Sequence, residues 1–213
     1  MKFKIITSSL LLLLTTTLDA KSSYNDWHFG HYVSKSHLHY VFNKVKRTSN
    51  VSQKALAKTF NYYEHNRYRK HLSKDFIAIA DYTKLATQKR LYIINLHTGA
   101  VSRYFVAHGV NSGAKGGRVW RSSNVYGTNM TPYGFFKVGR KEGKTVKKRH
   151  NYLPIDGLEW KNRNARKREI LLHTASYVSR LGRSNGCFAI LPEDRWKVFP
   201  RLKSALLYSY TGR

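Results

Sequence analysis

The sequence predicts a mainly β fold with flanking helices. Three runs of strand length, over residues 76–80, 91–96 and 101–106, are rich in β-branched and aromatic side chains. Apolar residues recur at helical spacing before these runs, over residues 53–70, and a helix start is indicated after them at Pro192. We therefore expect strands in the middle of the chain and helices toward its two ends.

Residues 1–20 have the pattern of a secretory signal peptide. Lys2 and Lys4 precede an apolar stretch over residues 5–18, and Ala20 is a plausible last residue before cleavage. The stretch is shorter than the roughly 20 residues that a membrane-spanning helix needs, although an uncleaved anchor is the alternative. We expect an exported, periplasmic protein with no stable membrane span after the signal is removed.

Residues 21–70 predict a basic arm followed by an N-terminal helix. Residues 21–50 are rich in His, Tyr, Ser and Lys without a sustained period, so we expect an irregular arm. Its histidines do not form a complete set of metal ligands, and we expect no metal. Ser52 is a suitable N-cap for the helix over residues 53–70, whose basic face we interpret as solvated.

Residues 71–213 are expected to form one β-rich domain. Residues 96–100 predict a hairpin connection, and residues 109–117, with four glycines, predict a loop. A turn is then expected to open a strand over residues 135–138. The basic stretch over residues 137–149 has few apolar side chains, which is typical of an exposed loop or hairpin tip.

The C-terminal part of this domain combines a short strand with helices. We predict a strand over residues 169–173, a connection over residues 174–182, and a helix that begins at Pro192 with acidic residues in its first turn. Pro200 is expected to break that helix. Residues 202–208 are then expected to form a further helix.

The charge of the chain indicates an anionic environment. The formal net charge is +28, while 41% hydrophobic and 14% aromatic residues are enough to supply a core, so the chain is not a disordered basic tail. The predicted export argues against nucleic acid as a partner. We expect anionic envelope polymers such as carboxylate-rich peptidoglycan or phosphate-bearing chains.

Cys187 is the only cysteine of the chain, so it cannot form an intramolecular disulfide. One interpretation is a buried, inert thiol, because free cysteine is among the most buried residue types. The alternative is a nucleophile, which requires a base and donors for the oxyanion that forms on the attacked carbonyl. His173, at the end of a predicted strand, could be the base, and the N–H groups of Gly186 and Cys187, with the Ser184 hydroxyl, could be the donors.

Arg183 and His108 are the candidates for substrate binding. A guanidinium can bind a carboxylate with two hydrogen bonds, which makes Arg183 a sensible anchor beside the thiol. Its alternative is a solvent-facing arginine, and the alternative for His108 is an ordinary loop histidine.

The segment from His173 to Cys187 resembles the active-site signature of the L,D-transpeptidase (YkuD-like) catalytic domain. Residues 182–187 match the Gly-Arg-Ser-x-Gly-Cys motif of a divergent branch of that family. Three further elements agree in order: Thr-Pro-Tyr-Gly-Phe-Phe at residues 131–136, Asp-Gly-Leu-Glu at residues 156–159 and Asn-Ala-Arg at residues 164–166. The strand-to-loop segment Val-Ala-His-Gly that ends at Gly109 is also similar. The resemblance covers roughly residues 50–200.

The resemblance implies a β-sandwich-type catalytic domain and a role for each matching residue. Cys187 would be the nucleophile, His173 its base, and the carbonyl of Thr174 would orient the imidazole. The residues implied at the oxyanion site are Ser184, Asn185 and Gly186. Two positions depart from the pattern: Asn185 replaces a histidine, and Ala189 replaces an arginine whose task Arg183 or His108 could take over.

The implied reaction is attack of a Cys187 thiolate on a peptidoglycan stem tetrapeptide. D-alanine leaves, a thioester forms, and an amine of a neighbouring stem resolves it into a cross-link. Water as acceptor would make the protein an L,D-carboxypeptidase. The resemblance implies no cofactor and no metal, and predicts that carbapenems acylate Cys187. A different hypothesis is a cationic envelope-binding protein with a vestigial site.

Overall fold

The computed structural model describes residues 31–147, 149–178 and 182–212. The predicted signal peptide and the first part of the predicted arm lie outside these residues. From Tyr32 onward the described chain belongs to one compact unit. Its helices are α2 (Lys35–Thr48), α3 (Gln53–Asn66) and α5 (Arg195–Leu202), with the short 3₁₀ helices η2 (Trp160–Asn162) and η3 (Pro192–Asp194).

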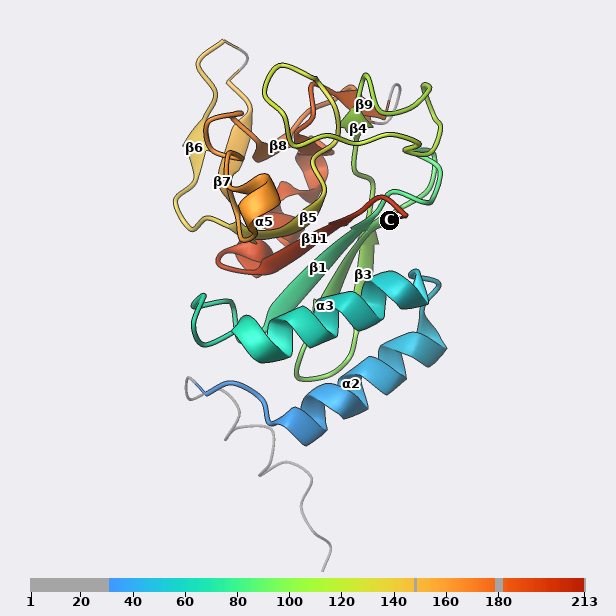
Figure 1. Ribbon diagram of the computed structural model, residues 1–213, viewed down its shortest axis with the longest axis vertical. Helices are drawn as coiled ribbons and strands as arrows, with labels where there is room; N and C mark the ends of the chain where they lie inside the picture. Colours follow the sequence, from blue (N-terminus) through green and yellow to red (C-terminus); the bar gives the residue numbers. More distant parts are fainter. Residues whose placement is uncertain (1–30, 148, 179–181, 213) are drawn as a thin grey trace, which may run out of the picture. The chain divides into compact units, whose positions relative to one another are not determined.

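The strands of the described residues form one large sheet and one small one (Figure 1). In chain order they are β1 (Phe76–Asp81), β2 (Leu91–Asn95), β3 (Val101–Tyr104), β4 (His108–Gly109), β5 (Gly134–Val138), β6 (Gly143–Lys144), β7 (Asn151–Gly157), β8 (Leu171–Thr174), β9 (Arg183–Ser184), β10 (Phe188–Ile190) and β11 (Leu206–Tyr210). The large sheet has the order β10-β8-β7-β5-β11-β1-β2-β3, with β6 paired to β7. Two of its pairs, β1 with β11 and β8 with β10, are parallel. The expected mainly β fold with helical flanks is confirmed.

The large sheet is buried on both of its faces. In β1, Ala78 and Ala80 belong to the main core, while Ile77 and Ile79 belong to a second core on the opposite face, as the two-residue period of a strand requires. The main core also contains Tyr104 of β3 and Ile190 of β10, which lie at opposite ends of the strand order. The sheet therefore curls around this core, which α5 closes with its buried side chains Val198, Phe199 and Leu202.

Helices α2 and α3 cover the second face, and Figure 1 shows α3 between α2 and the sheet. The prediction of an irregular arm over residues 21–50 was wrong for Lys35–Thr48, which form α2. Its apolar side chains Leu38, Val41 and Val45 have helical spacing but stand among His, Tyr and Lys residues, which obscured the period. The Ser52 N-cap is confirmed, because its hydroxyl accepts the Ala55 N–H at 3.4 Å. The helix ends at Asn66, earlier than expected.

Strand β11 replaces the helix predicted over residues 202–208. All five residues of β11 are buried, between β1 on one side and β5 on the other. A short apolar run that is buried on both faces looks the same in sequence whether it is a strand or a helix, which explains the error. Pro200 was also expected to end the preceding helix, yet α5 runs through it to Leu202. Pro200 is exposed, so the hydrogen bond that its ring removes lies toward solvent.

A polar clamp fixes the segment after β7 to β5. The Glu159 carboxylate accepts the Phe135 N–H at 2.7 Å, and the Asn162 side-chain amide donates to the Phe135 carbonyl at 2.9 Å. The Asn162 side-chain oxygen in turn accepts the Glu159 N–H at 3.0 Å. A Cβ at Gly157 would lie 1.9 Å from the Asn162 carbonyl oxygen, so this close approach requires glycine. The Asp-Gly-Leu-Glu motif is therefore structural at its Gly and Glu positions.

Candidate active site

Cys187 and His173 lie on one face of two neighbouring strands. His173 belongs to β8, and Cys187 directly precedes β10, which pairs in parallel with β8 and places Ala189 opposite His173. Leu172, which precedes His173, and Phe188, which follows Cys187, both belong to the main core. Because side chains alternate along a strand, His173 and Cys187 both point away from that core. Residues fourteen apart in sequence are thus brought together by one strand pair.

Both side chains line a cleft of about 1390 Å³. Of the other residues expected at the site, Arg183, Ser184 and Asn185 also line it. The basic stretch that was expected to be an exposed loop or hairpin tip includes β6, which pairs antiparallel with β7, and it contributes a wall of the cleft from Gly139 to Lys147. The cleft is strongly cationic, because its two acidic residues, Glu142 and Glu169, face seven basic ones: Arg140, Lys141, Lys144, Lys147, Arg166, Arg168 and Arg183. Such a lining attracts ligands that carry several negative charges.

The His173 ring is buried and held in a defined orientation. Its side chain is only 7% exposed, and its Nδ1 atom lies 3.0 Å from the Thr174 carbonyl oxygen. A carbonyl oxygen can only accept, so Nδ1 carries the hydrogen in a neutral ring and Nε2 keeps its lone pair. The His150 ring stacks on His173 at a centroid distance of 5.5 Å, and Tyr177 meets it edge-on at 6.5 Å. The ring therefore presents a proton acceptor from a fixed position.

The Cys187 thiol is half-buried and donates to the Glu169 carbonyl oxygen at 3.4 Å. Burial raises the pKa of this thiol, and the Leu171 N–H and the nearby Arg168 oppose that increase only in part. A raised pKa means that the resting thiol keeps its proton at neutral pH. Because the thiolate is the nucleophile, attack by Cys187 requires a base.

The loop before Cys187 is organised by Ser184. Its hydroxyl donates to the Cys187 carbonyl at 2.7 Å and accepts the Gly186 N–H at 3.2 Å. The Gly186 N–H, which the sequence suggested as an oxyanion donor, is therefore occupied by Ser184 in this structure. Gly186 has φ +112°, and a Cβ there would lie 2.8 Å from the Met130 carbonyl oxygen, so glycine is needed at this position. Asn185, the residue between them, is exposed.

His108 does not line the cleft, in contrast to its expected role at the substrate. It is fully buried, and its Nδ1 accepts from the Arg90 guanidinium at 2.8 Å. Burial, with the adjacent Arg90 cation, lowers the pKa of His108 to about 4. Strand β4, which contains His108, pairs with β9, so that His108 lies opposite Arg183 and Gly109 lies opposite Ser184. Through the pairing of β4 with β9, His108 thus supports the backbone that leads to Cys187.

Arg168 and Glu169 are the residues of the site that sequence reasoning missed. Arg168 donates to the carbonyls of Ser123 and Met130, at 2.9 and 3.1 Å, and so ties residues 123–130 to the segment before β8. Glu169 has a left-handed backbone conformation with φ +54°, which is unusual for a residue other than glycine. It aims its carbonyl at Cys187. No periodic or motif signal marks either residue in the sequence.

The described residues contain neither a metal cluster nor a membrane span. Nowhere in them do three or more His, Cys, Asp or Glu side chains gather as metal ligands would. None of the helices in the same residues combines the length and apolar character needed to cross a bilayer. His28, one of the histidines of the predicted arm, lies outside the described part of the chain.

Comparison with known proteins identifies the family. The family model YkuD_2, the L,D-transpeptidase catalytic domain, matches residues 47–210, and the chain belongs to this family. No curated protein matches the chain. Among solved structures, the helical cell shape determining protein Pgp2 of Campylobacter jejuni is similar at 17% identity and a TM-score of 0.40, over 65% of this chain and 49% of that one. A lysine-to-alanine mutant of Pgp2 gives 16% identity and 0.40, over 72% and 55%. The chain thus spans about half the length of these solved proteins.

Proposed function

We propose that this protein is a peptidoglycan L,D-transpeptidase that works through a Cys187 thioester. The observation that carries the proposal is the pairing of β8 with β10, which brings the Cys187 thiol and the His173 imidazole to the same face of the sheet, in one cationic cleft. Membership of the L,D-transpeptidase domain family supports the same reaction class.

The chemistry follows from the two side chains. His173 Nε2 takes the proton of Cys187 Sγ, and the sulfur attacks the carbonyl carbon of the third residue of a stem tetrapeptide. The bond from that carbon to the nitrogen of the terminal D-alanine breaks, and the imidazolium returns its proton to the departing amine. A thioester remains. An amine of a second stem then attacks the thioester, His173 accepts its proton, and the cross-link forms as the thiol is released.

The cleft supplies what this reaction needs beyond the two reacting groups. Stem peptides carry several carboxylates, and the cationic lining complements them. Arg183 of β9 lines the cleft four residues before Cys187, which supports a role for its guanidinium in binding a substrate carboxylate. The volume of about 1390 Å³ is larger than a single small ligand requires and leaves room for a donor and an acceptor stem.

Water could replace the amine, which would make the protein an L,D-carboxypeptidase through the same acyl-enzyme. The openness of the cleft to a second stem favours the transpeptidase. Export to the periplasm through the predicted signal peptide belongs to the same proposal, because the substrate lies outside the cytoplasm.

The experiment that tests the proposal follows products by intact mass. The purified, reduced protein is incubated with disaccharide-tetrapeptide beside Cys187→Ala and Cys187→Ser. We expect a dimer with the mass of two substrates minus one D-alanine from the native protein only, and a thioester adduct on Cys187. A tripeptide product would instead establish the carboxypeptidase. Folded native protein that yields no Cys187-dependent product would contradict the proposal and favour an envelope-binding role.

A further inference from the structure

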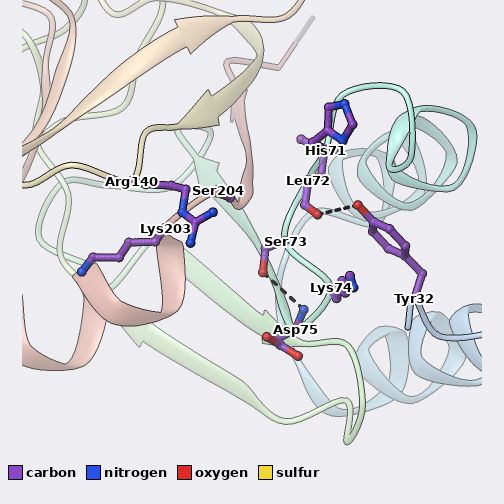
Figure 2. A pocket seen from close by; sticks show the side chains of 9 residues that line it. All are labelled: Tyr32, His71, Leu72, Ser73, Lys74, Asp75, Arg140, Lys203 and Ser204. Carbon is purple, nitrogen blue, oxygen red and sulfur yellow. Dashed lines mark hydrogen bonds between the residues drawn. The ribbon is translucent and has the colours of Figure 1, made fainter. Parts of the chain in front are cut away.

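A second pocket, of about 390 Å³, has a lining that includes neither Cys187 nor His173 (Figure 2). It lies where the connection from α3 to β1 meets the turn between α5 and β11. Arg140, which follows β5, completes its wall and also lines the catalytic cleft. The two cavities are therefore neighbours that share one guanidinium.

Backbone hydrogen bonds hold the walls of this pocket in place. The Ser73 N–H donates to the Ser204 carbonyl at 2.7 Å, and the Ser204 N–H donates to the Val138 carbonyl at 3.0 Å. The Tyr32 hydroxyl lies 2.9 Å from the Leu72 carbonyl oxygen, which fixes the aromatic wall seen in Figure 2. His71 and Ser204 both have left-handed backbones, with φ of 48° and 62°. Left-handed backbone conformations in residues other than glycine concentrate at functional sites.

The lining of the pocket contains more basic residues than acidic ones. Lys74, Arg140 and Lys203 line it, and none of the three forms an ion pair within the described residues. The one acidic residue of the lining, Asp75, is bonded to His97 Nε2 at 2.7 Å. The Lys74 ammonium lies 5.5 Å from the centre of the Tyr32 ring, a cation–π contact that directs it to one side of the pocket.

The pocket also offers hydroxyl donors. The Ser73 hydroxyl oxygen accepts the N–H groups of Asp75 and Phe76, at 3.2 and 3.3 Å, so its own hydrogen remains free for a ligand. Ser204 contributes a second hydroxyl to the lining. Three basic residues and two serines line the pocket, and a lining of this composition suits a doubly charged oxyanion better than a singly charged carboxylate.

We infer that this pocket binds a phosphate monoester. Its volume exceeds that of a bare phosphate and falls within the range of small-ligand sites, so the ligand is a phosphate attached to a larger group. The group could belong to a phosphorylated sugar of an envelope polymer or to a lipid headgroup, which share this chemistry. Because Arg140 lines both cavities, a polymer bound here would be held next to the catalytic cleft.

The test measures binding of N-acetylglucosamine 6-phosphate to the full chain by calorimetry. The variant Lys74→Gln/Lys203→Gln removes two cations that line this pocket and not the cleft. The matched control, Lys46→Gln/Lys54→Gln, removes the same charge from exposed helix positions. We expect the pocket variant to weaken binding about tenfold or more and the control about twofold or less, since only the first loses direct charge-assisted bonds.

Three further arms decide the ligand. Unphosphorylated N-acetylglucosamine and glucuronate should bind much more weakly than the phosphate ester. Binding to phosphatidylcholine vesicles that contain phosphatidic acid is measured for the native protein and for the pocket variant. Binding by the native protein alone would identify a lipid as the source of the phosphate. Equal losses in the pocket and control variants, or glucuronate binding as tight as the phosphate ester, would overturn the assignment. If the double variant folds poorly, the test is repeated with Lys203→Glu, which changes a single exposed residue. All arms measure binding, so they are unaffected by whether Cys187 proves catalytic.

Discussion

The buried Arg90–His108 pair makes the stability of this protein depend on pH. His108 is fully buried, and its Nδ1 accepts from Arg90, which is itself fully buried. A proton on Nδ1 would break this bond and place two positive charges in contact. Burial and Arg90 therefore lower the pKa of His108 to about 4, while the unfolded chain has the ordinary value near 6.5.

The sign and size of the effect follow from these two values. Above pH 6.5 His108 is neutral in both states and contributes no pH dependence. Between pH 6.5 and about 4 the unfolded state binds a proton that the folded state does not, so the free energy of unfolding falls as pH decreases. At about 1.4 kcal/mol per pKa unit, the whole window costs about 3 kcal/mol.

The assay is urea unfolding of the native protein and of His108→Gln between pH 7.5 and pH 4. Glutamine does not titrate, and its side-chain oxygen can still accept from Arg90. We expect the native curve to fall by about 3 kcal/mol more than the variant curve across this window, because other titrating groups are common to both proteins. Curves that stay parallel, within about 0.5 kcal/mol, would refute the burial argument. His108→Asn provides a second non-titrating comparison.

Four further outcomes are expected. Glu159→Ala should lower the free energy of unfolding by about 2 kcal/mol in urea titrations, because the buried Phe135 N–H loses its acceptor. Asp156→Asn in the same segment should cost less than about 1 kcal/mol, because its ion pair with Arg166 is solvent-exposed. Ser184→Ala removes two hydrogen bonds that shape the Cys187 loop, so carbapenem acylation followed by mass spectrometry should slow about tenfold. The same variant should lose about 1 kcal/mol of unfolding free energy, because the buried Gly186 N–H loses its acceptor. Alkylation of Cys187 by iodoacetamide should rise with pH above the ordinary thiol range, since burial raises its pKa, and a plateau by neutral pH would contradict this.

The central strands and the Cys187 motif could be predicted from sequence because their signals are local. Strands β1 and β2 are uninterrupted runs of strand-forming residues, and each begins at its predicted residue. The expected site residues from Arg183 to Asn185 line the cleft with Cys187 and His173. The β8–β10 pair positions His173 and Cys187, and the β4–β9 pair positions Arg183 and Ser184.

The errors have a different origin, because they concern long-range partners. Strand β11 was predicted as a helix because its pairing with β1 and β5, far away in sequence, decides its conformation. A histidine is a common substrate-binding residue, and only its hydrogen bond with the buried Arg90 shows that His108 belongs to the protein interior. Arg168 donates to the carbonyls of Ser123 and Met130, which are 45 and 38 residues away in sequence, and no spacing rule anticipates such contacts.

The position of β11 has a consequence for how the chain folds. The strand nearest the C-terminus lies in the middle of the large sheet, so β1 and β5 have no direct contact through hydrogen bonds and each presents an open edge until residues 206–210 arrive. Long-range pairings of this kind form late and slowly. The large sheet is therefore completed only when residues 206–210 insert between β1 and β5.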